Sequence, residues 1–196
     1  EGCASGTTFP RKVPPRMSLA ESEYTVLRHT IASRGTARIT LLPVTLIGWA
    51  LVAGTMPLLG NSPAMSLFSL MVLAGGFEAI HALHVGVERI GRYLQVFYEG
   101  VADVPRWETT AMSIGPALPG GGVDPLFTLI FTLATLLNLM AAIVPSPTRL
   151  ELAVIGLMHG AFLVRLVRAR WAATRQRTVD LGSYRAVKMR MPNSTE

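Results

Sequence analysis

The chain of 196 residues is both basic and apolar, with a net charge of +6 and half of its residues hydrophobic. Only 15% of the residues are charged, and the mean hydropathy is positive, at +0.41. Soluble domains contain about 25% charged residues, so this composition excludes an ordinary soluble domain and indicates a membrane protein. The single cysteine, Cys3, cannot form a disulfide within one chain and is uninformative about the redox compartment.

Residues 1–16 are polar and rich in proline, and they match neither a signal peptide nor a transit sequence. Met17 stands directly before a helix-start signal, so we expect translation to begin there and residues 1–16 to be a disordered or non-native leader. A capping box at 18–21 then predicts an amphipathic helix to about Ser33. We expect this helix to lie along the inner membrane surface or beneath the membrane-spanning helices.

Four segments are long and apolar enough to cross the roughly 30 Å hydrocarbon core, at about 39–59, 64–87, 126–144 and 150–167. A capping side chain followed by proline predicts the start of the last three helices, at Ser62-Pro63, Asp124-Pro125 and Ser146-Pro147. The sequence therefore predicts an all-α polytopic membrane protein. Its membrane domain, residues 17–178, is expected to be a four-transmembrane-helix bundle made of two helical hairpins.

The basic residues predict how the chain is threaded. Arg149 lies between the third and fourth spans. The other seventeen of the eighteen lysines and arginines precede the first span, lie between the second and third, or come after residue 164, at the end of the fourth span and beyond it. The positive-inside rule then places both termini in the cytoplasm. The protein is expected in the cell membrane, which is the inner membrane if the cell has two. The net charge is thus a signal of topology and does not indicate nucleic-acid binding.

Two further segments are expected on the cytoplasmic side. Residues 100–123 contain three prolines and three consecutive glycines, which predicts a long loop. The second helix should extend beyond the membrane, since 63–98 as one helix would be about 54 Å long. The fourth helix should extend likewise, before a C-terminal tail over 179–196.

Polar side chains line one face of the second predicted helix, within roughly 140° of arc. They are Glu78, His81, His84, Glu88, Arg89, Arg92, Gln95 and Glu99. An acid at mid-bilayer depth costs on the order of 2.5–3.5 kcal/mol, so these side chains are expected to face other helices, water, a cofactor or a partner.

Two kinds of cofactor site are conceivable on this face. Glu78, His81 and His84 have the spacing of metal ligands, and His159 with water could complete a site for one zinc or iron ion. Alternatively, His81 and His159 are expected at nearly the same depth on different helices, which is the minimum for a bis-histidine haem b. Arg89, Arg92 and Arg165 could then receive the haem propionates.

The same residues also allow a purely structural interpretation. Asn138 is expected at the depth of Glu78, so the two could form a hydrogen bond that, with Thr132, makes an intramembrane polar network. The histidines could likewise form hydrogen bonds to Asn138, Thr132 or a backbone carbonyl and bind no ligand. A third interpretation is passage of protons or ions along Glu78, His81, His84 and Glu88. Only Pro43 and the pair Gly75-Gly76 hint at the broken helices typical of transporters.

No phosphate-binding loop and no nucleophile beside a base is found, which favours a protein without catalytic activity. The sequence therefore predicts a non-catalytic membrane subunit or scaffold that associates with itself or with a larger membrane complex. A b-type haem or single-metal redox protein is the first alternative, and a small proton or ion transporter using Glu78 is the second. Contacts with lipid headgroups or a partner are expected at Arg89, Arg92, Arg165 and Arg168.

Overall fold

The computed structural model describes residues 18–60, 62–99, 106–114 and 125–191. Of these residues 93% are helical and none lies in a strand, so the expected all-α class is confirmed. The elements in order are α1 (Leu19–Gly60), the 3₁₀ turn η1 (Pro63–Met65), α2 (Ser66–Phe97), α3 (Trp107–Ile114), α4 (Pro125–Ile143) and α5 (Arg149–Arg190).

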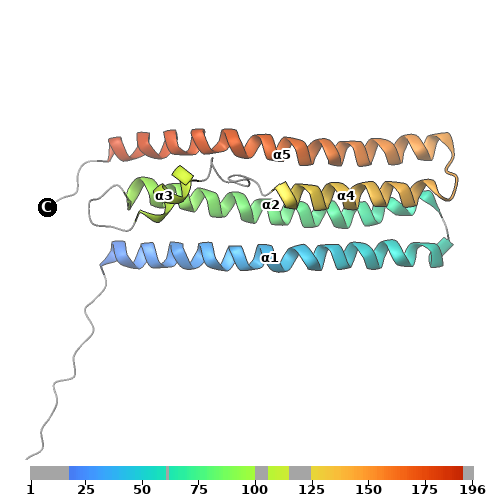
Figure 1. Ribbon diagram of the computed structural model, residues 1–196, viewed down its shortest axis with the longest axis horizontal. Helices are drawn as coiled ribbons and strands as arrows, with labels where there is room; N and C mark the ends of the chain where they lie inside the picture. The colour runs from blue at the N-terminus through green and yellow to red at the C-terminus, as the bar shows by residue number, and fades with distance from the viewer. Residues whose placement is uncertain (1–17, 61, 100–105, 115–124, 192–196) are drawn as a thin grey trace, which may run out of the picture.

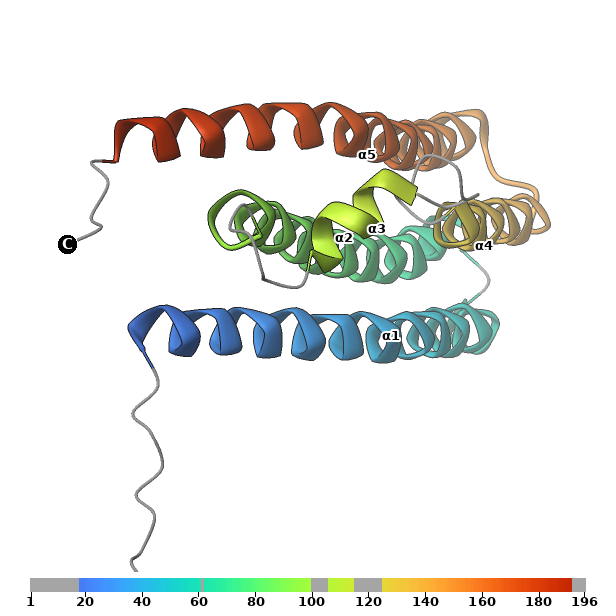
Figure 2. The ribbon, with the colours of Figure 1, turned by 60° about the vertical axis from the view of Figure 1, so that its left-hand side comes forward.

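The helices lie nearly parallel to one long axis, in three layers (Figure 1). α1 forms one outer layer and α5 the other, while α2 lies between them with α4 beside one of its ends and α3 beside the other. The same order is visible after rotation (Figure 2). α2 is the central element, since it contacts α1, α3, α4 and α5.

Three helices are long and apolar enough to cross a membrane, within Leu19–Thr55, Pro63–Phe97 and Arg149–Arg190. The segment predicted as the third span, 126–144, coincides with α4, whose described apolar part Phe127–Ile143 is shorter than the other three. Length and composition therefore support a multi-pass membrane protein with three clear candidate spans.

The expected separate N-terminal helix is not found, because it is the first third of α1. The capping box that starts it is present: the Ser18 backbone N–H donates to the Glu21 carboxylate at 2.8 Å, and the Glu21 N–H donates to Ser18 Oγ at 3.2 Å. The helix then continues for 42 residues through Gly35 and Pro43. A single glycine or proline weakens a helix locally, but packing of α1 along α2 keeps it continuous.

The start of α5 also differs from the expectation. Thr148 is the N-cap, with its hydroxyl accepting from the Glu151 N–H at 3.3 Å and the Glu151 side chain accepting from Thr148 N–H at 2.8 Å. Ser146 instead takes a positive φ of 56° in the preceding turn. Ser62 precedes η1 without a side-chain cap, and Asp124 lies outside the described residues. α5 runs to Arg190, so most of the segment predicted as a tail continues this helix.

α1 approaches α2 closely at Gly76. A Cβ atom built there would overlap the side chain of Thr45, including its Cβ at 2.7 Å. No heavy atom would lie within 4 Å of a Cβ on the neighbouring Gly75. Small residues allow membrane helices to pack closely, and Gly76 has this function here.

Candidate functional site

Polar side chains inside the structure form two groups near opposite ends of α2. The Asn138 cluster, near the Pro63 end, consists of Trp49, Ser66, Ser69, Asn138 and His159. The Arg92 network, toward the Phe97 end, consists of Arg38, His84, Glu88, Arg92, Gln176 and Asp180.

Asn138, on α4, is only 2% exposed and joins all four long helices. Its Oδ1 accepts hydrogen bonds from Ser69 Oγ of α2 at 2.5 Å and from Trp49 Nε1 of α1 at 3.3 Å. Its Nδ2 lies 2.9 Å from both the Ser66 carbonyl oxygen and His159 Nε2 of α5. The amide group thereby uses its full capacity of two donors and two acceptors.

His159 is fully buried and engaged through both ring nitrogens. Its Nε2 faces the Asn138 amide, and its Nδ1 lies 2.8 Å from the Ile155 carbonyl oxygen. Since the Asn138 NH₂ group can only donate, Nε2 is the acceptor and Nδ1 carries the proton that is donated to Ile155. This is a neutral imidazole with no nitrogen left for a metal.

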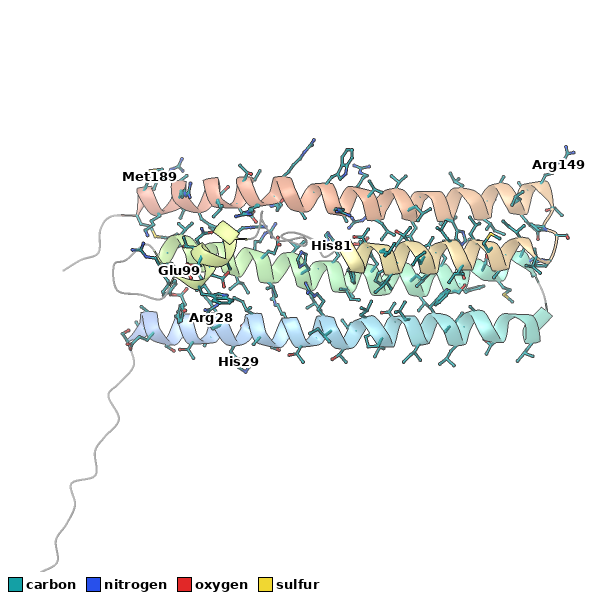
Figure 3. The ribbon with its side chains drawn as sticks, in the orientation of Figure 1. Arg28, His29, His81, Glu99, Arg149 and Met189 are labelled. Carbon is teal, nitrogen blue, oxygen red and sulfur yellow. The ribbon has the colours of Figure 1, made fainter. Side chains whose placement is uncertain are left out.

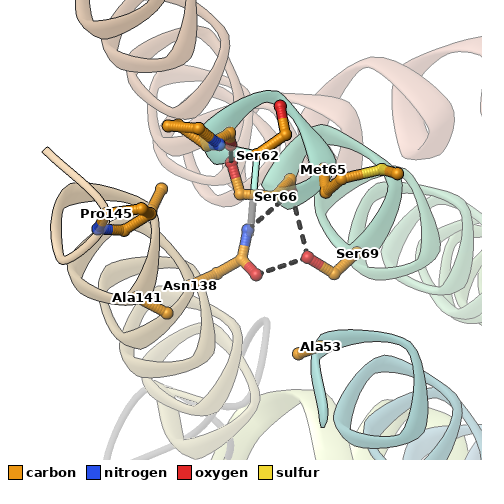
Figure 4. Close-up of a pocket in the computed structure, with 10 residues that line it drawn as sticks. Ala53, Ser62, Met65, Ser66, Ser69, Asn138, Ala141 and Pro145 are labelled. Carbon is orange, nitrogen blue, oxygen red and sulfur yellow. Dashed lines mark hydrogen bonds between the residues drawn. The ribbon is translucent and has the colours of Figure 1, made fainter. Parts of the chain in front are cut away.

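A cavity of about 80 Å³ adjoins the Asn138 cluster (Figure 4). Polar groups of Ser66, Ser69 and Asn138 lie on one side of it, and the dashed lines mark their hydrogen bonds. Its other lining residues include Ala53, Met65, Ala141 and Pro145. The cavity is large enough for a few water molecules and too small for a macrocyclic cofactor.

An aromatic layer separates the two polar groups. Phe77 lies 5.5 Å from Phe131, 5.8 Å from Phe162 and 5.9 Å from Phe127, measured between ring centroids. Phe77 and Phe131 are at most 2% exposed. These rings belong to α2, α4 and α5 and pack between these three helices, at a level between the two polar groups.

Glu78 is not bonded to Asn138, contrary to expectation. Its carboxylate accepts from Arg165 Nη2 at 2.7 Å, in a half-exposed ion pair between α2 and α5. Nine residues of α2 separate Glu78 from Ser69, which is level with Asn138, and this corresponds to about 14 Å along the helix. Thr132 donates to the Thr128 carbonyl oxygen of its own helix at 2.8 Å. The predicted network of Glu78, Asn138 and Thr132 is therefore wrong.

His81 and His159 are not at the same depth. Because Arg165 is level with Glu78, His159, six residues before Arg165, is level with about position 72 of α2. His81 therefore lies nine residues further along, or about 14 Å. His81 stacks on Phe77 at 5.6 Å and lies near the middle of the molecule in Figure 3. The expectation failed because it measured depth from Glu88 and Arg165, and Arg165 is in fact level with Glu78. One haem between these two histidines does not fit this arrangement.

The predicted metal ligands are also directed to other partners. His84 Nδ1 lies 2.9 Å from Arg38 Nη1, and its Nε2 lies 3.5 Å from the Glu88 carboxylate. Glu78 is paired with Arg165, as described above. In the described parts of the chain, no three histidine, cysteine, aspartate or glutamate residues are grouped so that they could hold a metal ion.

Arg92 is the largest buried polar side chain, at 1% exposure. It forms an ion pair with Asp180 of α5 at 2.6 Å and another with Glu88 on its own helix. Gln176 Nε2 donates to the other Asp180 oxygen at 2.8 Å. The sequence predicted that Arg92 contacts lipid headgroups or a partner, but its burial prevents contact with headgroups. Arg92 instead joins α2 to α5. Arg89 and Arg165 are 54% and 40% exposed, and Arg168 is also exposed.

Glu99 holds the short helix α3 in place, which the sequence did not reveal. Its buried carboxylate accepts from the backbone N–H groups of Glu108 and Thr109, both at 2.6 Å, and thus caps the start of α3. Glu108 then pairs with Arg28 of α1 at 2.9 Å. Figure 3 shows Arg28 and Glu99 at the same end of the molecule. Burial raises the pKa of Glu108 above its usual value. The positive charge of Arg28 partly opposes this shift, and the negative charge of Glu99 adds to it.

Comparison with known proteins gives no relative for this arrangement. No family model, no curated protein and no solved structure matches the chain. Its function has therefore to be inferred from the chain's own geometry.

Proposed function

We propose that this chain is a non-catalytic integral membrane subunit or scaffold that associates with itself or with a larger membrane complex. We further propose that it crosses the membrane four times, as two helical hairpins with both termini in the cytoplasm. α4 would be the third span, since its 19 residues reach about 28 Å, close to the core thickness.

One observation carries the proposal: the polar side chains inside the helices serve to hold the helices together. Asn138 joins four helices near one end of α2, and Arg92 and Asp180 join two helices near the other. Catalytic groups are usually free to meet a substrate, whereas buried groups that satisfy one another stabilise a single arrangement. Among the described residues, three buried side-chain atoms lack a hydrogen bond: His84 Nε2, Arg92 Nε and Gln95 Oε1. All three are in or next to the Arg92 network, and none is in the Asn138 cluster.

The length of the helices suggests where a partner would bind. α1 and α5 have 42 residues each and are about 63 Å long, twice the hydrocarbon thickness. Beyond the membrane the helices stay packed through Tyr93, whose hydroxyl donates to Glu23 at 2.9 Å and whose ring lies 5.8 Å from Tyr184. A firmly packed cytoplasmic projection is a suitable surface for docking another protein.

The alternatives have less support from the geometry. A haem between His81 and His159 would have to bridge about 14 Å along the helix axis. Ion passage from Glu78 toward the Asn138 cluster would have to cross the aromatic layer around Phe77.

The mass of the purified protein in a mild detergent tests the association. We expect a multiple of the 21.1 kDa chain, or a stable complex with other subunits. A strictly monomeric chain that co-purifies with nothing would contradict the proposal.

Threading can be tested separately by labelling single cysteines in intact cells, in a Cys3→Ser background. A membrane-impermeant reagent should label Ser146→Cys and should not reach Arg175→Cys until the cells are opened. Labelling of Arg175→Cys in intact cells would overturn the proposed orientation.

A further inference from the structure

A groove between α1, α2 and α5 has a composition that no interpretation above explains. Its volume is about 430 Å³, and it is lined by Glu23, Leu27, Arg34, Gly86, Arg89, Ile90, Tyr93 and Tyr184. Cationic, phenolic and aliphatic side chains thus surround one space. A ligand with an anionic, hydroxyl-bearing group would match the cationic and phenolic side chains.

Arg34 is the decisive residue of the groove. It is half-buried, and its guanidinium occupies the space over Gly86 where a Cβ atom would otherwise lie. Its two neighbouring arginines on α1 are partnered, Arg28 by Glu108 and Arg38 by His84. No hydrogen bond or ion pair to Arg34 is found within the part of the chain that the structure describes. A half-buried guanidinium that faces a groove without a counter-ion favours an anionic ligand.

The other charges of the groove agree with this. Arg89 is 54% exposed, and its Nε lies 3.8 Å from the Asp180 carboxylate. That carboxylate is bound more closely by Arg92, at 2.6 Å. Glu23 is the acidic residue that lines the groove. Its carboxylate accepts a hydrogen bond of 2.9 Å from the Tyr93 hydroxyl. Two arginines against one partnered carboxylate leave the groove positive.

The position of the groove indicates the source of the anion. Gly86 lies twenty residues after the start of α2 at Ser66, which corresponds to about 30 Å, the thickness of the hydrocarbon core. Arg34 and Arg89 are therefore at the depth of phospholipid headgroups, and Leu27 and Ile90 line the groove on their cytoplasmic side or level with them.

We propose that this groove binds the phosphate-bearing headgroup of an anionic phospholipid, with Arg34 and Arg89 as the groups that contact the phosphate. Arginine forms paired hydrogen bonds with phosphate oxygens, and the tyrosine hydroxyls can bond to a glycerol-type headgroup. The site rests on the proposed membrane threading, which places this end of α2 at the cytoplasmic leaflet.

The test measures lipid binding to the purified full chain in a neutral detergent. Phosphatidylglycerol, phosphatidylcholine and inorganic phosphate are added separately, and bound lipid is counted by native mass spectrometry. We expect one phosphatidylglycerol to be retained selectively, with an increase in Tm that saturates. Equal retention of phosphatidylcholine would overturn the proposal, and so would an equal effect of inorganic phosphate, which would point to a free anion.

Three variants distinguish a defined site from general attraction of basic residues. Arg34→Gln combined with Arg89→Gln should weaken phosphatidylglycerol binding about tenfold or more. Gly86→Ala keeps the net charge but displaces the Arg34 guanidinium, so it should weaken binding several-fold while the protein remains folded. Arg175→Gln is the matched control, because Arg175 is exposed at a similar depth on α5, does not line the groove, and should leave binding unchanged.

An equal loss in Arg175→Gln and in the double variant would mean that the attraction is diffuse and that no such site exists. The cysteine labelling described above separates this outcome from a failure of the threading. Correct labelling without phosphatidylglycerol selectivity would refute the groove alone. Reversed labelling with selectivity retained would refute the threading and leave the groove as a binding site.

Discussion

Asn138 on α4 and His159 on α5 are joined by a hydrogen bond of 2.9 Å, with both residues at most 2% exposed. Replacing Asn138 by alanine would leave His159, Ser69 and Trp49 without this partner. We expect Asn138→Ala to lower the free energy of unfolding by about 1–3 kcal/mol. Thr132→Ala is the control, because Thr132 bonds only within α4, and it should change stability by less than about 0.5 kcal/mol. Equal effects on denaturation in detergent would contradict this role of Asn138.

His81 and His159 should respond differently to mutation. His159→Ala opens a hole in a fully buried hydrogen-bonded cluster and should lower Tm clearly, whereas His81, which is half-exposed, should tolerate alanine. The absorbance spectrum of the purified protein gives a second readout. A Soret band that disappears in both variants would revive the haem interpretation and refute the separation of about 14 Å between the two histidines along the helix axis.

Arg92 and Asp180 should be strongly coupled. Asp180→Ala leaves the buried Arg92 with only Glu88, and we expect a loss of about 3 kcal/mol in unfolding free energy. Arg92→Met/Asp180→Ala should lose less than the sum of the two single variants, because neither charge is then left alone. Arg185→Gln, at an exposed position on the same helix, is expected to be near neutral. Strict additivity in this double-mutant cycle would argue against the ion pair.

The two adjacent glycines of α2 provide a paired test of helix packing. Gly76→Ala would force α1 away at Thr45 and should cost about 1–3 kcal/mol. Gly75→Ala meets no neighbouring atom within 4 Å and should be neutral, or stabilising by up to about 1 kcal/mol through helix propensity. The order of the two Tm values is the measurement, and a reversed order would mean that α1 does not pack on α2 as described.

The pKa of Glu108 gives the protein a pH dependence that can be measured. Because burial raises this pKa above its usual value of 4.5, the folded protein holds the proton more firmly than the unfolded chain. This contribution to stability is present below pH 4.5 and is lost as the pH rises through the raised pKa. Glu108→Gln does not ionise and therefore cannot lose this contribution. The Tm of the wild type should fall more, or rise less, between pH 4.5 and pH 7 than the Tm of the variant. An unchanged difference would contradict the shift.

The sequence by itself determined the class of this protein. Apolar runs such as 64–87 can be buried only in a membrane or in a large core, and the local pattern at 18–21 gave the start of α1 correctly. Such features depend on residues close in the chain. The continuity of α1 past Ser33 was missed because its stability comes from packing against α2, which no local pattern records.

Only the tertiary structure decided which polar residues meet. The sequence singled out Glu78, Asn138, His159 and Arg92 as unusual. The structure pairs His159 with Asn138 and a backbone carbonyl, as one interpretation of the sequence allowed, but gives Glu78 and Arg92 partners that the sequence did not suggest. Partners depend on the register between helices, and an error of a few residues at 1.5 Å each moves a side chain beyond hydrogen-bond reach. In the structure α5 is shifted along α2 so that Arg165 meets Glu78 and Asp180 meets Arg92, while His159 meets Asn138. The packing of the aromatic rings around Phe77 fixes that shift, and it depends on the shapes of side chains from three helices.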